Sequence, residues 1–263
     1  DKGLTVSGSG ELDNGWTVST YTYLSDAMGL SSHATSLTMG SLGTITAGQG
    51  WGGNSSGFDE EVPQAYEQIS DLTAKGSSNS VGSFMDNGGL TWAVPSFDLG
   101  GASASLVLGF SPNGDDAGTN NGAVGTRSGN WGQGYDAGLT LSTDMGLTVG
   151  VYAATRENNT PNPSGTRATA DEFNGTWYAK YSAGPVSFGY QTSYFDSGLA
   201  GTAVIAAASP ATVGTSSGTF EAESMSIAFN VNDNLSLSWT DTDDTYDIQD
   251  HESTALADVT QST

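Results

Sequence analysis

Hydrophobic and polar residues alternate along most of this chain. The clearest case lies near the C-terminus, where Leu235, Leu237 and Trp239 are separated by serine residues. A period of two places successive side chains on opposite faces of a β-strand. The pattern predicts about twelve strands, each with a more apolar and a more polar face. They cover residues 3–11, 15–24, 33–40, 43–49, 88–96, 101–110, 133–142, 146–155, 172–182, 185–195, 220–231 and 234–241.

Short turns and long loops follow one another in strict order between these strands. The short turns, such as 12–15 and 231–234, join the strands in pairs. The pairs are separated by long polar segments rich in Gly, Asn, Asp and Ser, such as 111–130, 156–170 and 196–218. In an antiparallel sheet, the short turns would therefore lie at one end and the long loops at the other. This organisation is typical of a transmembrane β-barrel.

The strands themselves also suit a membrane barrel. They are about nine to eleven residues long, which matches a tilted crossing of the bilayer. Aromatic residues gather near the strand ends, as in the two interfacial girdles of such barrels. We expect one set of side chains to face lipid or a neighbouring subunit: Leu147, Val149, Val151, Leu235, Leu237 and Trp239. We expect the alternate set to face the lumen: Thr148, Tyr152, Ser236 and Ser238.

Composition narrows the class of protein. Only 13% of the residues are charged, whereas soluble domains average about 25%. The sequence contains no run of about 18 apolar residues, so it predicts no transmembrane helix. The absence of cysteine excludes disulfides. Six Lys and Arg against 29 Asp and Glu give a net charge of −23, so we expect no nucleic-acid binding. Such acidity fits either a solvated, salt-adapted surface or an acidic pore.

Residues 50–87 form the segment that fits the pattern least. They are too long for a hairpin loop and contain four aromatic residues, Trp51, Phe58, Tyr66 and Phe84. These aromatic rings need a surface to pack on, and the inner wall of a barrel would supply one. The segment also holds an acidic group consisting of Asp59, Glu60, Glu61, Glu67 and Asp71.

The stretch 40–50, Gly-Ser-Leu-Gly-Thr-Ile-Thr-Ala-Gly-Gln-Gly, resembles the strand that leads into the constriction loop of general diffusion porins. The order of strands, folded-in loop and regular hairpins is similar too, up to about residue 247, and is closest to porins of the alphaproteobacterial type. One departure is Thr263, because porins of this kind usually end on an aromatic residue.

This resemblance implies an all-β, transmembrane antiparallel β-barrel in the bacterial outer membrane. Residues 1–263 would form a single, incomplete barrel domain with about twelve of sixteen strands, and 50–87 would be its constriction loop. The implied protein is a homotrimer surrounded by outer-membrane lipid and lipopolysaccharide, through which small hydrophilic solutes and ions diffuse. The small residues Ala34, Ser36 and Thr38 share one face of an early strand and suit a subunit interface.

By the same resemblance, the loop narrows the pore about halfway down, and its carboxylates face basic residues on the opposite wall. Lys180 lies on the polar face of its strand, so we expect it in the lumen. Three arginines in or beside long loops either fold inward or remain solvated: Arg127, Arg156 and Arg167. Carboxylates outnumber these cations, which predicts a preference for cations.

A second acidic group offers a possible ion site. Its four carboxylates lie within seven residues and belong to Asp241, Asp243, Asp244 and Asp247. Oxygen-rich clusters suit Ca²⁺, so this group is either a structural calcium or magnesium site or a solvated acidic loop.

Catalytic chemistry has no positive support in the sequence. His33 and His251 are far apart, and the sequence contains no nucleophile elbow, phosphate loop or dinucleotide fingerprint. Two alternatives to a diffusion channel remain. One is a soluble or secreted β-sandwich, such as a surface-layer or adhesin module, and the other is a barrel enzyme.

Overall fold

The computed structural model describes residues 3–50, 54, 57–65, 88–112, 131–158, 166–168, 170–196, 198–201, 219–232, 234–247 and 259–262. Almost all of the regular structure in these ranges is strand, with one short 3-10 helix at Gly40–Leu42. None of the described helical structure is long and apolar enough to cross a membrane. The strands are β1 (Leu4–Glu11), β2 (Thr17–Leu24), β3 (Leu30–Thr38), β4 (Thr44–Gln49), β5 (Gly89–Ala93), β6 (Phe97–Asp98), β7 (Ala102–Ser111), β8 (Trp131–Thr143), β9 (Leu147–Asn158), β10 (Thr166–Ala168), β11 (Glu172–Ala183), β12 (Val186–Asp196), β13 (Leu199–Gly201), β14 (Thr219–Asn232), β15 (Leu235–Asp247) and β16 (Val259–Ser262).

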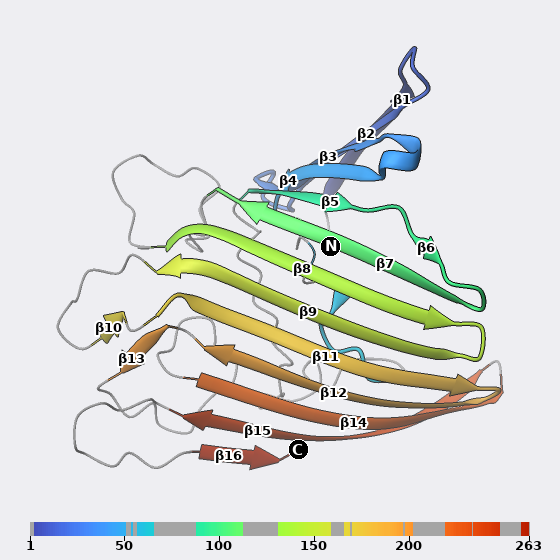
Figure 1. Cartoon of the computed structure of the whole chain (residues 1–263), viewed down its shortest axis with the longest axis vertical. Coiled ribbons are helices and arrows are strands. Elements are labelled where there is room, and N and C mark those ends of the chain that lie inside the picture. The colour runs from blue at the N-terminus through green and yellow to red at the C-terminus, as the bar shows by residue number, and fades with distance from the viewer. Residues whose placement is uncertain are drawn as a thin grey trace.

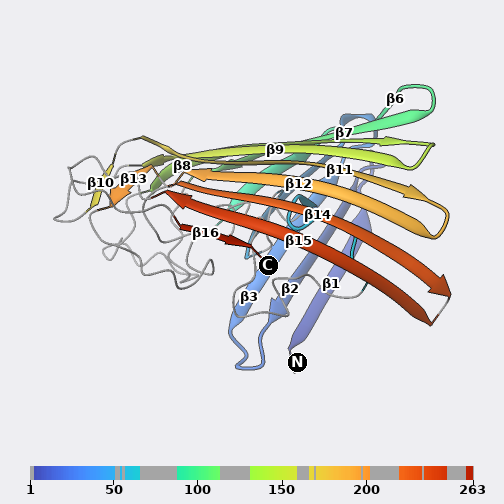
Figure 2. The ribbon, with the colours of Figure 1, turned by 90° about the horizontal axis from the view of Figure 1, so that it is seen from below.

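Fourteen of these strands form one antiparallel sheet in which chain neighbours are sheet neighbours (Figure 1). The short β10 and β13 pair separately, and β6 pairs with β7 at its turn end. The turns from β8 to β9, β11 to β12 and β14 to β15 lie together on the right of Figure 1. Figure 2 shows that the sheet curves, so that β1–β3 turn away from the plane of β8–β15. The all-β, antiparallel prediction is confirmed, and the sheet remains open, with β1 and β16 at its edges.

Two differences from the predicted strands have a clear physical reason, besides small shifts at strand ends and three short strands, β10, β13 and β16, that were not predicted. The predicted strand 88–96 is shorter than expected: β5 ends at Ala93, two residues before Pro95, which has no backbone N–H to donate to a neighbouring strand, and β6 begins only at Phe97. The predicted loop from residue 242 onward is wrong at its start, because β15 continues to Asp247. Its acidic residues lie within the backbone register with β14, where Asp243, Asp244 and Asp247 pair with Glu223, Ala222 and Thr219.

The two faces of the sheet differ as the alternation predicts. On the outer face, Leu235, Leu237 and Trp239 are 47%, 56% and 58% exposed. Val151 lies on this face between its cross-strand partners Leu139 and Trp177. The inner face carries Gly, Ser, Thr, Asn and Gln, and many of these side chains are buried. An exposed apolar face this extensive requires a covering of lipid or protein.

One face prediction is wrong. Ser36 pairs with Thr46, and the register continues through Thr91 and Gly109 to Asp136 on the inner face. Ala34 and Thr38 lie on the same strand two positions to either side, so they face inward as well. The residues of β3 that alternate with them and face outward are His33, Thr35 and Leu37.

Candidate functional site

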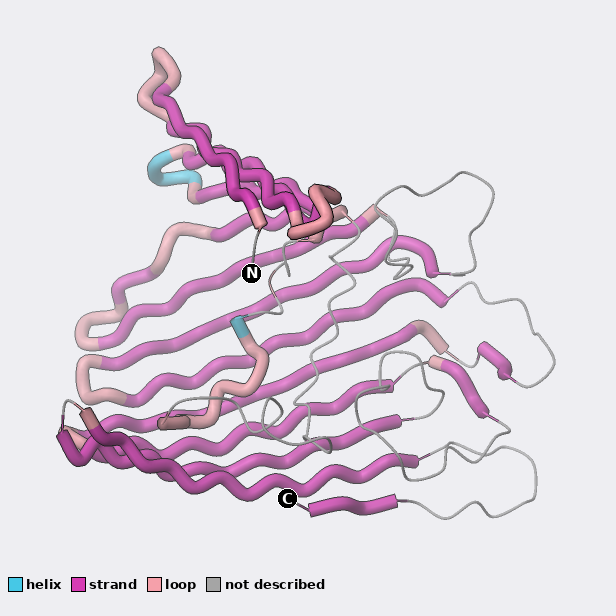
Figure 3. The backbone as a smooth tube through the Cα atoms, turned by 180° about the vertical axis from the view of Figure 1, so that it is seen from behind, coloured by secondary structure: helices cyan, strands magenta, loops and turns pink. Residues whose placement is uncertain are grey.

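The described part of the 50–87 segment lies across the inner face of the sheet (Figure 3). It crosses the strands in their order in the sheet, beginning at Asn54. The amide Nδ2 of Asn54 donates to the carbonyl of Val107 on β7 at 3.2 Å and to Asp136 Oδ1 on β8 at 3.4 Å. The prediction that this segment folds onto the inner wall is therefore confirmed for residues 54 and 57–65.

Phe58 is the aromatic anchor of the segment. Its ring lies 5.3 Å from the ring of Tyr152 on β9 and 6.2 Å from that of Tyr178 on β11. All three side chains are buried, and the Tyr152 hydroxyl donates to Asp136 Oδ2 at 3.0 Å. Tilted aromatic pairs at these separations add stability beyond the area that they bury. The inward position of Tyr152 also confirms its predicted face.

Glycines on the inner wall make room for the loop. A Cβ atom at Gly138 on β8 would lie 2.3 Å from the Phe58 ring, and one at Gly189 on β12 would lie 2.2 Å from Cδ of Pro63. Neither approach is possible for any residue with a side chain. The absence of a side chain at these two glycines therefore lets Phe58 and Pro63 pack against the strand backbone. Glycine inside a strand often marks such a close approach.

Polar wall side chains hold the loop backbone beyond Phe58. Gln191 Oε1 on β12 accepts from the amide of Glu61 at 2.6 Å. Ser226 on β14 donates through its hydroxyl to the carbonyl of Pro63. Ser238 on β15 accepts from the amide of Ala65 at 3.0 Å, which confirms its predicted inward position. The loop is thus hydrogen-bonded to three neighbouring strands of the sheet, β12, β14 and β15, at positions inside each strand.

One ion pair joins the loop to the wall. Lys180 Nζ on β11 lies 2.5 Å from Glu61 Oε2, and the two side chains are 36% and 20% exposed. The ammonium group also lies 5.2 Å from the centre of the Tyr178 ring, within cation–π range. The structure therefore brings together two residues predicted from the sequence, and their charges offset one another.

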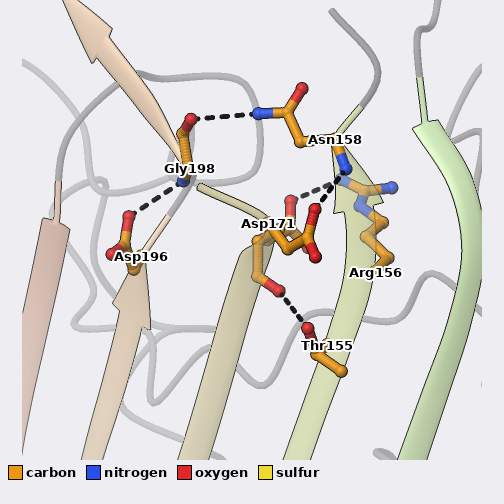
Figure 4. Close-up of polar contacts among 7 residues, drawn as sticks. Thr155, Arg156, Asn158, Asp171, Asp196 and Gly198 are labelled. Carbon is orange, nitrogen blue, oxygen red and sulfur yellow. Dashed lines mark hydrogen bonds and ion pairs between the residues drawn. The ribbon is translucent and has the colours of Figure 1, made fainter. Parts of the chain in front are cut away.

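Arg156 lies elsewhere on the inner face. It forms a buried ion pair with Glu172 at 2.6 Å, and both side chains are 3% exposed. Glu172 lies eight positions before Lys180 on β11, which is about 26 Å along the strand at 3.3 Å per residue. Figure 4 shows Arg156 among polar contacts that link β9 to the long-loop ends of β11 and β12. Arg156 therefore belongs to the long-loop edge of the sheet and not to the Glu61–Lys180 ion pair.

The remaining predicted charges are placed as follows. Asp59 is exposed, and its Oδ1 accepts from the amide of Glu60, whose own side chain is buried. The side chain of Arg167, in β10, lies outside the part of the chain that the structure describes. Three further predicted residues lie wholly outside it: Glu67, Asp71 and Arg127.

The acidic group of β15 is divided by the strand. Asp241 and Asp243 face outward with Met225 and Glu223, whereas Asp244 is buried on the inner face opposite Ala222. The side chain of Asp247 lies outside the described residues. Among the side chains that the structure does describe, no three Asp, Glu or His residues lie close enough to share a metal ion. The alternation of β15 thus separates residues that the sequence places in one run.

Sequence reasoning missed the wall residues that receive the loop. Gln191 and Glu61 are 130 positions apart, and nothing in the local pattern connects them. The one sequence feature that could have indicated where the loop contacts the wall is glycine inside strands, at Gly138 and Gly189.

Comparison with known proteins agrees with this arrangement. The sequence matches the family model of the Gram-negative porins over residues 1–258. No curated protein matches the chain at a significant level. Among solved structures, the fold is similar to that of a porin refined at 1.8 Å resolution, with a TM-score of 0.52 and 16% identity over 94% of this chain and 82% of that one. Because the family model covers nearly the whole sequence, the chain belongs to the Gram-negative porin family.

Proposed function

We propose that this porin prefers cations and that residues 57–65, with the wall around Lys180, form the narrowest part of its channel. The observation that carries the proposal is the seating of an acidic loop on the inner face of the sheet. The Glu61–Lys180 pair lies on the inner wall three positions before the end of β11 at Ala183, where a constriction would act on every passing solute.

The balance of charge supports the cation preference. The cationic side chains described on the inner face are Lys180 and Arg156, each in an ion pair with one glutamate. The described loop and inner wall carry further carboxylates besides those two glutamates, namely Asp59, Glu60, Asp136 and Asp244. The whole chain has the same bias, with 29 acidic residues against six basic ones. A negative potential in a narrow, low-dielectric passage attracts cations and excludes anions.

We further propose an outer-membrane homotrimer. The outer face of β7–β15 is apolar and suits lipid and lipopolysaccharide acyl chains. The outer face of β1–β4 is mixed: beside apolar residues such as Val6, Val18 and Leu37 it carries Gly8, Thr20, Thr22, Thr35 and Gln49, which suit contact with another copy better than contact with hydrocarbon. Sedimentation in mild detergent should give the mass of a trimer, and a monomer would count against this assembly.

The alternatives are less consistent with the fold. A β-sandwich buries its apolar faces between two sheets, whereas the apolar face of the main sheet here is exposed. The porin family and fold point to transport rather than to catalysis.

Reversal potentials across a KCl gradient in planar bilayers test the cation preference. We expect a potential of the sign given by K⁺ permeation, reduced when Asp59, Glu60 and Glu61 are replaced by their amides. Anion selectivity, or a potential unaffected by these replacements, would refute the assignment.

A further inference from the structure

Gln191 is the wall residue most completely engaged with the loop. It lies at the middle of β12, faces inward, and is 0% exposed. A glutamine side chain offers one carbonyl acceptor and two N–H donors. Its Oε1 accepts from the amide of Glu61 at 2.6 Å, and its Nε2 donates to the carbonyl of Phe58 at 2.8 Å and to Thr176 Oγ1 at 3.1 Å. One amide therefore joins two points of the loop backbone to the wall.

The side chain is itself held in a fixed orientation. Thr176 donates through Oγ1 to the backbone carbonyl of Thr192 at 2.9 Å and accepts from Ser193 Oγ at 3.0 Å. These contacts anchor the hydroxyl that receives the second N–H of Gln191. The carboxamide cannot rotate without breaking bonds on both sides.

The two loop atoms that Gln191 binds enclose the acidic turn. Phe58 and Glu61 flank Asp59 and Glu60, so the amide closes a ring around one exposed and one buried acidic residue of the loop. Glu61 also carries the carboxylate that pairs with Lys180. The position of this ion pair thus depends on the same hydrogen bond that fixes the Glu61 backbone.

We propose that Gln191 is the positioning residue of the constriction, holding Phe58–Glu61 in one arrangement and so keeping the channel at a single conductance level. The proposal rests on the channel function proposed above. Without the amide, the carbonyl of Phe58 and the N–H of Glu61 lose their partner in a buried site, which favours rearrangement of the turn.

The test compares Gln191→Leu and Gln191→Asn with the natural chain and with Gln133→Leu. Leucine removes the amide at similar size, whereas asparagine keeps a buried amide but shortens it by one methylene. Gln133 bonds Glu157 on β9 and serves as the matched control. Hydrogen exchange at the amide of Glu61 and current fluctuations of single open channels are measured for all four proteins.

In both Gln191 variants, exchange at Glu61 should accelerate about tenfold, the factor that corresponds to one lost hydrogen bond. Transitions between conductance levels should increase, while the exchange of strand amides stays unchanged. Gln133→Leu should match the natural chain. Unchanged exchange at Glu61 in the Gln191 variants would overturn the positioning role, even in a protein that does not conduct. Failure of the natural chain to conduct would instead refute the channel function.

Discussion

Removing the positive charge of Lys180 should strengthen the cation preference. Lys180 and Glu61 form a 2.5 Å ion pair between wall and loop, so their charges largely cancel for a passing ion. Lys180→Met keeps an unbranched, apolar side chain against Tyr178 and leaves the Glu61 carboxylate without its counter-charge.

The size of the effect follows from the exposure of the pair. Because the two side chains are 36% and 20% exposed, we take the dielectric constant of water, which gives the smallest interaction energy between a passing ion and the carboxylate. A K⁺ ion about 4 Å from the carboxylate then gains about 1 kcal/mol before screening. Screening lengths of about 8 Å at physiological ionic strength and about 3 Å at 1 M leave roughly 0.6 and 0.3 kcal/mol. These energies correspond to roughly threefold and 1.5-fold more K⁺ at the site.

Reversal potentials across KCl gradients measure this change. The ratio of K⁺ to Cl⁻ permeability should rise at least threefold in dilute salt, since the same potential excludes chloride, and the gain should shrink near 1 M. Lys180→Arg keeps the charge and should behave as the natural chain. The double variant Lys180→Met with Glu61→Gln should also have a permeability ratio close to that of the natural chain. A potential that does not move, or that moves toward anions, would show that the pair does not border the ion path.

Three further changes probe other parts of the molecule. Gly189→Ala should lower single-channel conductance, because Pro63 has to withdraw toward the lumen by about 1.2 Å, from an approach of 2.2 Å to the 3.4 Å of ordinary contact. Gly10→Ala, where the added Cβ meets nothing within 4 Å, should leave conductance unchanged. Because the chain has no cysteine, single cysteines can carry spin labels at Val149 and Thr148, which should report lipid and water respectively; the reverse result would overturn the assignment of faces. Arg156→Leu removes the counter-charge of the buried Glu172 carboxylate and should destabilise the protein by about 3–5 kcal/mol in thermal or denaturant unfolding, whereas a cost near zero would mean that the pair is solvated.

The architecture was predictable because its signal is local. Alternation at Leu235, Leu237 and Trp239 assigns faces without knowledge of partners, since side chains in a strand alternate by geometry. The inward fold of the loop was predictable for a similar reason, because the buried ring of Phe58 needed a surface.

The details of the site depend on contacts between distant residues. That Gln191 receives Glu61, or that Gly189 receives Pro63, follows only from the strand register. The same holds for Arg156, whose partner Glu172 lies opposite it on β11. The acidic run from Asp241 resembled a loop locally, and its pairing with β14 makes it a strand.

Single-channel conductance in planar bilayers, measured with and without residues 58–65, tests the role of the loop most directly. The natural chain is expected to insert in discrete conductance steps, and the shortened chain in larger ones, because the segment that lies across the inner face is gone. A shift in gel mobility on boiling checks that both proteins are folded. Steps of equal size from two folded proteins would contradict the placement of the loop at the narrowest part of the channel.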